Sequence, residues 1–121
     1  MDIKTFKLLL IKAWCAETAL GVWSKECPSL NQCAVTALVA QDYFGGVMLR
    51  CKMTNGDSHY WNRLPDGSEE DFTEDQFDFI QDKPLKNDYV IRERDYVLSF
   101  PATVVRYELL KHRLEDAIKN Q

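Results

Sequence analysis

The chain has few of the features that mark several large classes of protein. It has only 2 histidines in 121 residues, and none of its 4 cysteines form a Cys-x-x-Cys pair. No apolar run approaches the length of a membrane span. With 15 Lys and Arg against 19 Asp and Glu the net charge is −4, so the basic face that a phosphate backbone needs is missing. We therefore expect neither a nucleic-acid partner nor a membrane partner.

Cysteine usage predicts a reducing compartment. The cysteines are irregularly spaced, at Cys15, Cys27, Cys33 and Cys51. The apolar pattern of residues 2–15 is broken by Lys12 and is not followed by a small-residue cleavage site, which argues against a signal peptide. We expect free thiols in the cytoplasm, with no cofactor and no metal. A zinc site built from scattered cysteines and His59 or His112 is kept as an alternative.

Length and composition predict one globular domain over residues 1–121, because a chain of this size buries roughly two-thirds of its unfolded surface. Acidic residues gather between positions 66 and 82, and this run is read as solvated surface. It lacks the alternating spacing of a calcium-binding loop.

Three helices are predicted from the apolar spacing. The first covers residues 2–15, the second begins near Asn31–Cys33 and runs to Phe44, and the last covers residues 103–119. Ser29 and Asn31 are the candidate N-caps of the second helix. Gly45 and Gly46 follow its end, where glycine takes the left-handed conformation without strain.

Strands are predicted over residues 47–53, 58–64 and 68–72, joined by turns at Asn55-Gly56 and Pro65-Asp66-Gly67. Thr73 and Gln76 resemble a capping box that opens a short helix through Phe77, and residues 81–101 are expected to be irregular. The predicted fold class is α+β: a small antiparallel sheet packed against a central helix that carries Cys33, with helices at both termini.

Cys33 stands where polar residues give way to the apolar run of the second helix. A cysteine in the first turn faces unpaired N–H groups, which favour a thiolate and can stabilise a developing oxyanion. A nucleophilic cysteine also needs a base. His59, on a predicted strand, is the better candidate, because His112 falls on the polar side of the last helix.

Asp71 is assigned as the third group from turn geometry. A three-residue loop with Pro65 first and Gly67 at the left-handed position pairs Leu64 with Ser68. In that register His59 and Asp71 are diagonal neighbours on one sheet face. A two-residue turn would instead move Asp71 to the opposite face.

Each of these residues also has a purely structural interpretation, which stays open at this point. Cys33 can be a small core residue, His59 a buried histidine with satisfied hydrogen bonds, and Asp71 a helix cap or a solvated side chain. The candidate binding residues are Asn31, Gln32, Trp23 and Trp61. Aromatic residues such as Trp23 more often simply pack in a core.

Three segments, NQCAVTALVAQDYFGG, SHYWNRLPDG and DFTEDQF, resemble the YunG-like family of small bacterial proteins. This resemblance does not imply any particular biochemical activity. The order of a helix with Cys, a strand with His and a strand with Asp also resembles the core of papain-like and transglutaminase-like enzymes. That likeness implies Cys33 as nucleophile, His59 as base and Asp71 as the orienting group. Two departures are Cys27, where papain-like enzymes have an oxyanion-hole glutamine, and Ala34, where transglutaminases have tryptophan.

The sequence therefore favours a cysteine-dependent hydrolase or acyltransferase that cleaves an amide, peptide or thioester bond in a peptide, protein or small amide substrate. The alternative is a non-catalytic protein-binding module on the same fold, which would use its aromatic side chains to hold a partner.

Overall fold

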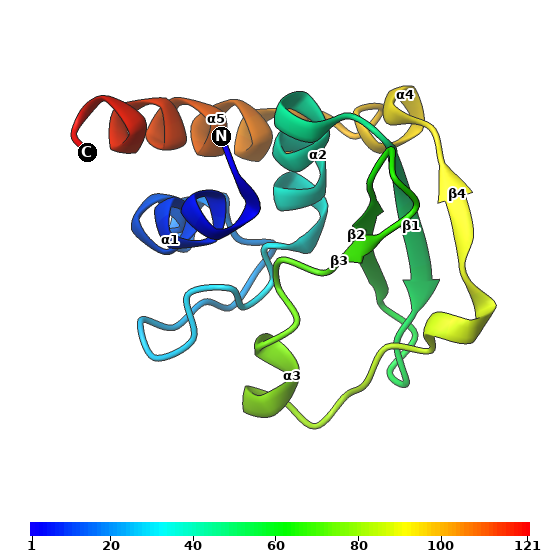
Figure 1. Ribbon diagram of the computed structural model, residues 1–121. Coiled ribbons are helices and arrows are strands. Elements are labelled where there is room, and N and C mark those ends of the chain that lie inside the picture. The colour runs from blue at the N-terminus through cyan, green and yellow to red at the C-terminus, as the bar shows by residue number, and fades with distance from the viewer.

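Helix α2, Cys33–Phe44, lies in the middle of the structure, a computed structural model that describes all 121 residues (Figure 1). The sheet flanks it on one side, and α1 (Ile3–Ala13) and α5 (Pro101–Lys119) lie on the other. Six consecutive residues of α2, 35–40, are buried. A helix that is apolar all round is stable only when it is covered on every side. The α+β class and the central position of this helix are confirmed.

The helix boundaries follow local signals in the sequence. Asp2 caps α1 by accepting a hydrogen bond from the Thr5 N–H at 2.7 Å. Gly45 ends α2 with a φ of 75°. Helix α5 begins two residues earlier than predicted, because Pro101 occupies its first turn, where the missing N–H has no consequence.

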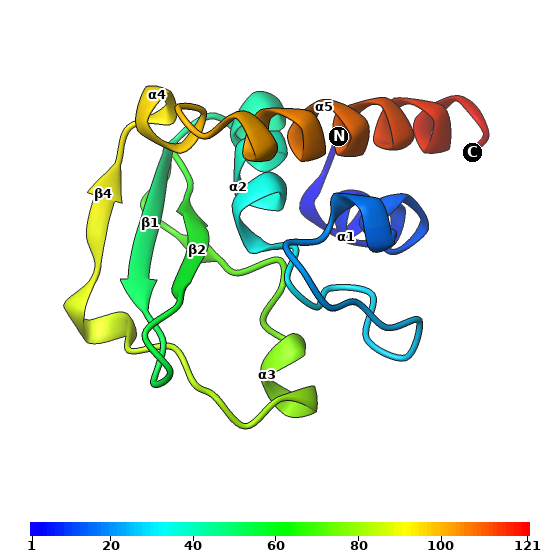
Figure 2. The same ribbon diagram turned by 180° about the vertical axis from the view of Figure 1, so that it is seen from behind.

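The sheet has four antiparallel strands in the order β3-β2-β1-β4. Figure 2 shows β2, β1 and β4 side by side. The strands are β1 Val47–Lys52, β2 Ser58–Arg63, β3 Glu69–Glu70 and β4 Val90–Arg92. Strand β3 is shorter than predicted and pairs only with residues 62 and 63 of β2. The other end of β2, at Ser58 and His59, therefore has no strand beside it on that edge.

Two predictions outside the sheet centre were wrong. Residues 81–101 are not irregular, since they contain a 3₁₀ turn at Lys86–Asp88, strand β4 and the short helix α4, Arg94–Val97. The helix after β3, α3 (Gln76–Phe79), has no capping box. The Thr73 hydroxyl accepts a hydrogen bond from the Gln76 side chain instead of from the backbone.

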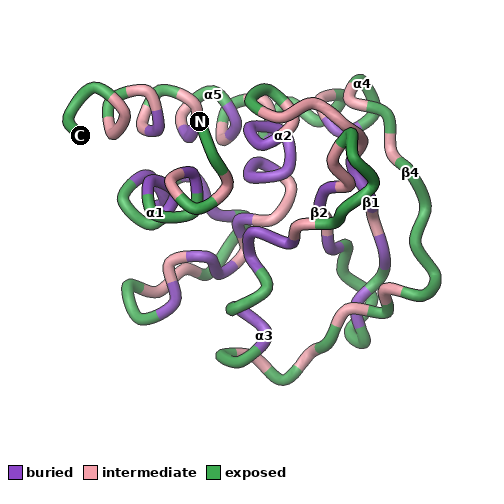
Figure 3. The backbone as a smooth tube through the Cα atoms, in the orientation of Figure 1, coloured by how far each residue is buried: buried purple, intermediate pink, exposed green.

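The core lies where α1, α2 and α5 meet the sheet, and Figure 3 shows the buried stretches of these helices facing one another. The largest fully buried members include Phe6, Leu10, Leu38, Met48 and Leu110. Within this core the indole N–H of Trp14 donates to the Thr36 hydroxyl at 2.9 Å.

Gly46, with a φ of 77°, lies where α2 turns into β1. A Cβ atom there would stand 2.1 Å from the Arg63 carbonyl oxygen, so only glycine fits this close approach. The Asn62 side chain donates to the Ala37 carbonyl oxygen and ties β2 to α2 from the same end.

None of the helices combines the length and the apolar character that crossing a membrane requires.

Candidate functional site

Cys33 is the first residue of α2. The N-cap is Gln32, and no side chain caps the helix, so the prediction of Ser29 or Asn31 as the cap was wrong. The Asn31 amide donates to the Val22 carbonyl oxygen at 2.7 Å, and Ser29 is buried against the Cys27 sulfur. The first N–H with a partner inside the helix is that of Thr36. The N–H groups of the first turn, beginning at Cys33, are therefore free of intrahelical partners.

Asn31 holds the chain in the left-handed conformation just before the helix, with a φ of 60°. Three hydrogen bonds stabilise this geometry. Its N–H donates to the Gln76 side-chain oxygen at 3.2 Å, its carbonyl oxygen accepts from the Leu20 N–H at 2.9 Å, and its amide donates to Val22. A non-glycine residue persists at positive φ only where its surroundings enforce it. Here they fix the direction in which α2 begins.

His59 and Asp71 form a buried pair. His59 Nε2 lies 2.6 Å from Asp71 Oδ2, and neither residue is more than 8% exposed. The predicted three-residue loop brings them together. The Leu64 N–H donates to the Ser68 carbonyl oxygen at 2.8 Å, and Gly67 has a φ of 89°. The chain leaves the sheet after Glu70, one residue before Asp71, so the aspartate reaches the ring from beside β2.

Two aromatic rings enclose the imidazole of His59. Trp61 stacks on it with ring centroids 5.8 Å apart, and Phe77 of α3 meets it edge-on at 4.8 Å. The Trp61 indole N–H donates to Glu69 at 2.8 Å, which keeps the stacked ring in place. These contacts fix the plane of the imidazole.

The second ring nitrogen of His59, Nδ1, is buried and makes no hydrogen bond of ordinary geometry. Since Nε2 is occupied by Asp71, Nδ1 is the nitrogen left to face the Cys33 thiol. Burial alone lowers the pKa of His59, but the hydrogen bond with Asp71, the proximity of Cys33 and the charges of both raise it to about 9. The ring is therefore an imidazolium at neutral pH, placed between a carboxylate and a sulfur.

Asp71 is held as a carboxylate by several donors. Burial raises its pKa, but the hydrogen bond and charge of His59 and those of Lys86 outweigh burial and lower it. Lys86 Nζ lies 2.8 Å from Asp71 Oδ2, and the Thr73 N–H donates to the other oxygen at 3.2 Å. Both oxygens have partners, so the carboxylate cannot rotate away from His59 without breaking these bonds.

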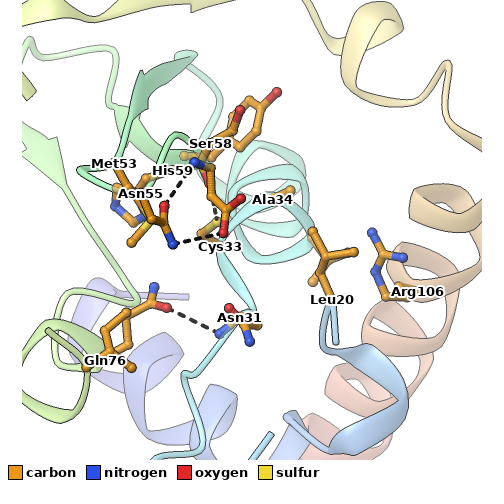
Figure 4. A pocket seen from close by; sticks show the side chains of 14 residues that line it. Leu20, Asn31, Cys33, Ala34, Met53, Asn55, Ser58, His59, Gln76 and Arg106 are labelled. Atoms are coloured by element: carbon orange, nitrogen blue, oxygen red, sulfur yellow. Dashed lines mark hydrogen bonds between the residues drawn. The ribbon is translucent and has the colours of Figure 1, made fainter. Parts of the chain in front are cut away.

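Cys33 and His59 open into one cavity of about 430 Å³ (Figure 4). Figure 4 shows Leu20 and Arg106 on one side of it and Met53, Asn55 and His59 on the other. The Cys33 sulfur lies 3.9 Å from the Ser58 carbonyl oxygen, at the end of β2 that β3 does not reach. The cavity is lined by Leu20, Asn31, Cys33, Ala34, Val35, Met53, Asn55, Asp57, Ser58, His59, Tyr60, Gln76, Ile80 and Arg106.

The four predicted binding residues lie in different places. Asn31 lines the cavity, but Gln32, Trp23 and Trp61 do not. Gln32 is fully buried and its amide donates to the Cys15 carbonyl oxygen at 2.9 Å. The Trp23 indole N–H is bonded to the Pro28 carbonyl oxygen at 2.9 Å within its own loop. Trp61 stacks on the His59 imidazole instead.

Ser58, Gln76 and Arg106 are among the cavity residues that reasoning from the sequence missed. Ser58 directly precedes His59, so its neighbourhood could have been inferred from that of His59. Gln76 is 3% exposed and bonds to the Asn31 backbone across 45 positions of sequence. Arg106 comes from α5. Neither residue carries a local signal of its place in the cavity.

All four cysteines are free. No group of three or more His, Cys, Asp or Glu side chains is placed to hold a metal ion, so the zinc alternative has no ligand set in this structure.

Comparison with known proteins places the chain in a family. The sequence profile described as YunG protein matches residues 2–119. A protein of Bacillus subtilis (strain 168), named Uncharacterized protein YunG, is 39% identical to this chain over 71 residues. That match covers 59% of this chain and 59% of the relative. No solved structure matches the chain.

Proposed function

Because the chain belongs to the YunG protein family, whose name assigns no chemistry, we propose from the site itself that it is a cysteine-dependent hydrolase or acyltransferase. In this proposal Cys33 is the nucleophile, His59 the acid and base, and Asp71 the orienting group. The observation that carries it is the buried His59–Asp71 pair, whose remaining ring nitrogen has no partner and which shares one cavity with a cysteine at an uncapped helix N-terminus.

The proposed reaction has two stages. The Cys33 thiolate attacks the carbonyl carbon of an amide or thioester, and the bond from that carbon to nitrogen or sulfur breaks. The His59 imidazolium gives its Nδ1 proton to the leaving group, which departs as an amine or thiol and leaves a thioester on Cys33. Neutral His59 then takes a proton from water, or from an acceptor amine, as that nucleophile attacks the thioester. The thiolate and the imidazolium are restored when the second product leaves.

Asp71 acts through His59 in this scheme. It fixes the tautomer with the proton-bearing Nε2 toward the carboxylate, and it stabilises the charged ring. The backbone N–H groups of Cys33 and Ala34 are the proposed donors to the oxyanion, because both residues line the cavity and the helix has no side-chain cap. Gln32 is not assigned this role, since its amide is bonded to the Cys15 carbonyl oxygen.

The assignment of a papain-like or transglutaminase-like core is part of the same proposal. A helix that begins at the cysteine, a neighbouring strand with the histidine and a following aspartate is the order found in papain-like and transglutaminase-like cores. This likeness is an analogy of layout, and one fold hosts many functions. The site chemistry, rather than the analogy, supports the proposed activity.

Alkylation resolved by site tests the nucleophile. Folded protein is treated with iodoacetamide at pH 6, and the rate at each cysteine is read by peptide mass spectrometry. We expect Cys33 to react at least tenfold faster than Cys15, which is also half-buried but has no imidazolium beside it. His59→Gln should abolish the difference. Equal rates at Cys33 and Cys15 in the native protein would overturn the proposal.

Acyl transfer is tested separately with p-nitrophenyl acetate. The proposal expects transient acetylation of Cys33, seen as a mass increase that decays in water, and none in Cys33→Ser. If Cys33 is alkylated quickly but never forms this thioester, the protein is instead the non-catalytic binding module that the sequence left as the alternative.

A further inference from the structure

Arg106 is a cation without a charged partner. It lies half-buried on α5, and its one side-chain hydrogen bond is a donation to the Thr103 hydroxyl at 3.2 Å. None of the five ion pairs in the molecule includes it. Arg94, on α4, is by contrast paired with Asp42 at 2.8 Å. An unpaired, partly desolvated guanidinium is poised to bind an anion.

Arg106 borders two adjoining cavities. The first is the one that holds Cys33 and His59. The second, of about 360 Å³, is mainly apolar and is lined on its far side by Tyr96, Val97 and Phe100. The two cavities share Leu20, Ala34, Ser58, Tyr60 and Arg106. A ligand with its reactive carbonyl at Cys33 and an apolar group in the second cavity would lie alongside the Arg106 guanidinium.

No carboxylate of the protein neutralises Arg106. Burial lowers the pKa of Arg106 and the charge of Cys33 raises it, so the two groups share one electrostatic environment. The carboxylate that lines the same cavity, Asp57, accepts from the Asn55 amide at 3.1 Å and makes no ion pair with Arg106. The cavity thus offers an incoming carboxylate a guanidinium whose only protein partner is the Thr103 hydroxyl.

We propose that the substrate is an anionic amide, a peptide or acylated amino acid with a free terminal carboxylate and an apolar side chain. Arg106 binds the carboxylate, and the side chain enters the cavity beside Tyr96 and Phe100. This specificity rests on the proposed function, because it describes the substrate of the same cysteine.

Two matched electrophiles test it: N-iodoacetyl-phenylalanine and N-iodoacetyl-phenylalanine amide. They share the reactive group and the aromatic ring and differ only in the terminal charge. The rate of Cys33 alkylation by the acid is divided by the rate with the amide. This ratio cancels any change in the reactivity of the sulfur. We expect a ratio of about ten in the native protein, since a hydrogen bond to a charged group has a net value of roughly 1.5 kcal/mol.

Arg106→Gln should bring the ratio to about one, and Arg106→Lys should keep part of the preference. The matched control is Lys119→Gln, which removes one positive charge from an exposed position on the same helix, about 20 Å further along its axis. It should leave the ratio unchanged. If Arg106→Gln does not fold, protection of native Cys33 from iodoacetamide by N-acetyl-phenylalanine, and not by its amide, measures the same preference.

The two proposals fail in different ways. Slow alkylation of Cys33 by both probes, at the rate of Cys15, overturns the nucleophile and with it the specificity. Fast alkylation with the same ratio in the native protein and Arg106→Gln overturns only the role of Arg106.

Discussion

Replacing Asp71 by Asn isolates the charge that holds His59 protonated. The two side chains have nearly the same shape, and Asn keeps an oxygen for the Thr73 N–H, so the loop after β3 should persist. The pKa of His59 is raised from 6.5 to about 9 against the effect of burial. This rise corresponds to roughly 3 kcal/mol in favour of the charged ring.

Asp71 supplies the largest of the contributions that raise the pKa of His59, and Cys33 supplies the rest. Assigning about half of the total to Asp71 gives roughly 1.5 kcal/mol, a factor of about ten in the protonation equilibrium. In Asp71→Asn the pKa of His59 should therefore fall from about 9 by about one unit. The pH above which Cys33 loses its fast alkylation should fall by the same amount, because the imidazolium beside the sulfur is then lost at a lower pH.

Two measurements check this expectation. Titration of the imidazole resonances by NMR gives the pKa of His59, with the exposed His112 as a reference in the same spectrum. Iodoacetamide labelling at a series of pH values gives the rate at Cys33. The matched control is Asp57→Asn, which removes a carboxylate from the same cavity without touching His59. The reasoning is refuted if His59 titrates as in the native protein, or if both variants shift the pH dependence of Cys33 alkylation equally.

Three further predictions concern stability. The lowered pKa of Asp71 contributes stability that is present above pH 3.8 and is lost as the pH falls through the folded-state pKa. The urea midpoint should therefore fall more steeply between pH 5 and 3 in the native protein than in Asp71→Asn. Equal dependence of the two midpoints on pH would contradict the lowered pKa of Asp71. Gly46→Ala should lower the free energy of unfolding by at least 2 kcal/mol, because the added Cβ would lie 2.1 Å from a carbonyl oxygen. Gly56→Ala, whose added Cβ would have nothing within 4 Å, should cost about 1 kcal/mol from its backbone conformation alone. In thermal denaturation Gly46→Ala should therefore have the lower midpoint of the two. Thr36→Val leaves the buried Trp14 N–H without its acceptor and should cost about 1–3 kcal/mol in urea unfolding; an unchanged midpoint would mean that the indole finds another partner.

Much of the site follows from signals within a few residues of it. Pro65-Asp66-Gly67 fixes the loop length, and the loop length fixes which residues of β2 face the segment that carries Asp71. The start of α2 at Cys33 follows from the change from polar to apolar residues, and its end follows from Gly45.

The parts that sequence reasoning missed depend on contacts between distant segments. Val90-Ile91-Arg92 is too short and too exposed to show a periodic pattern, and it becomes a strand only by pairing with β1. Ser29 and Asn31 have the right chemistry for a cap, but hydrogen bonds to Cys27 and Val22 of the preceding loop take both side chains elsewhere. Arg106 reaches the cavity because α5 packs across α2, an arrangement that no pattern inside α5 encodes.

The three-residue loop between β2 and β3 also has a consequence for how the protein folds. His59 and Asp71 are 12 positions apart, whereas Cys33 is 25 positions from its contact at Ser58. Closing the longer span costs about 0.6 kcal/mol more in chain entropy and requires α2 to dock on the sheet. We expect the histidine–carboxylate pair to assemble before the sulfur arrives during refolding. Until that last step Cys33 would react no faster than an ordinary exposed thiol, and pulses of iodoacetamide at pH 6 would record when its faster reaction begins.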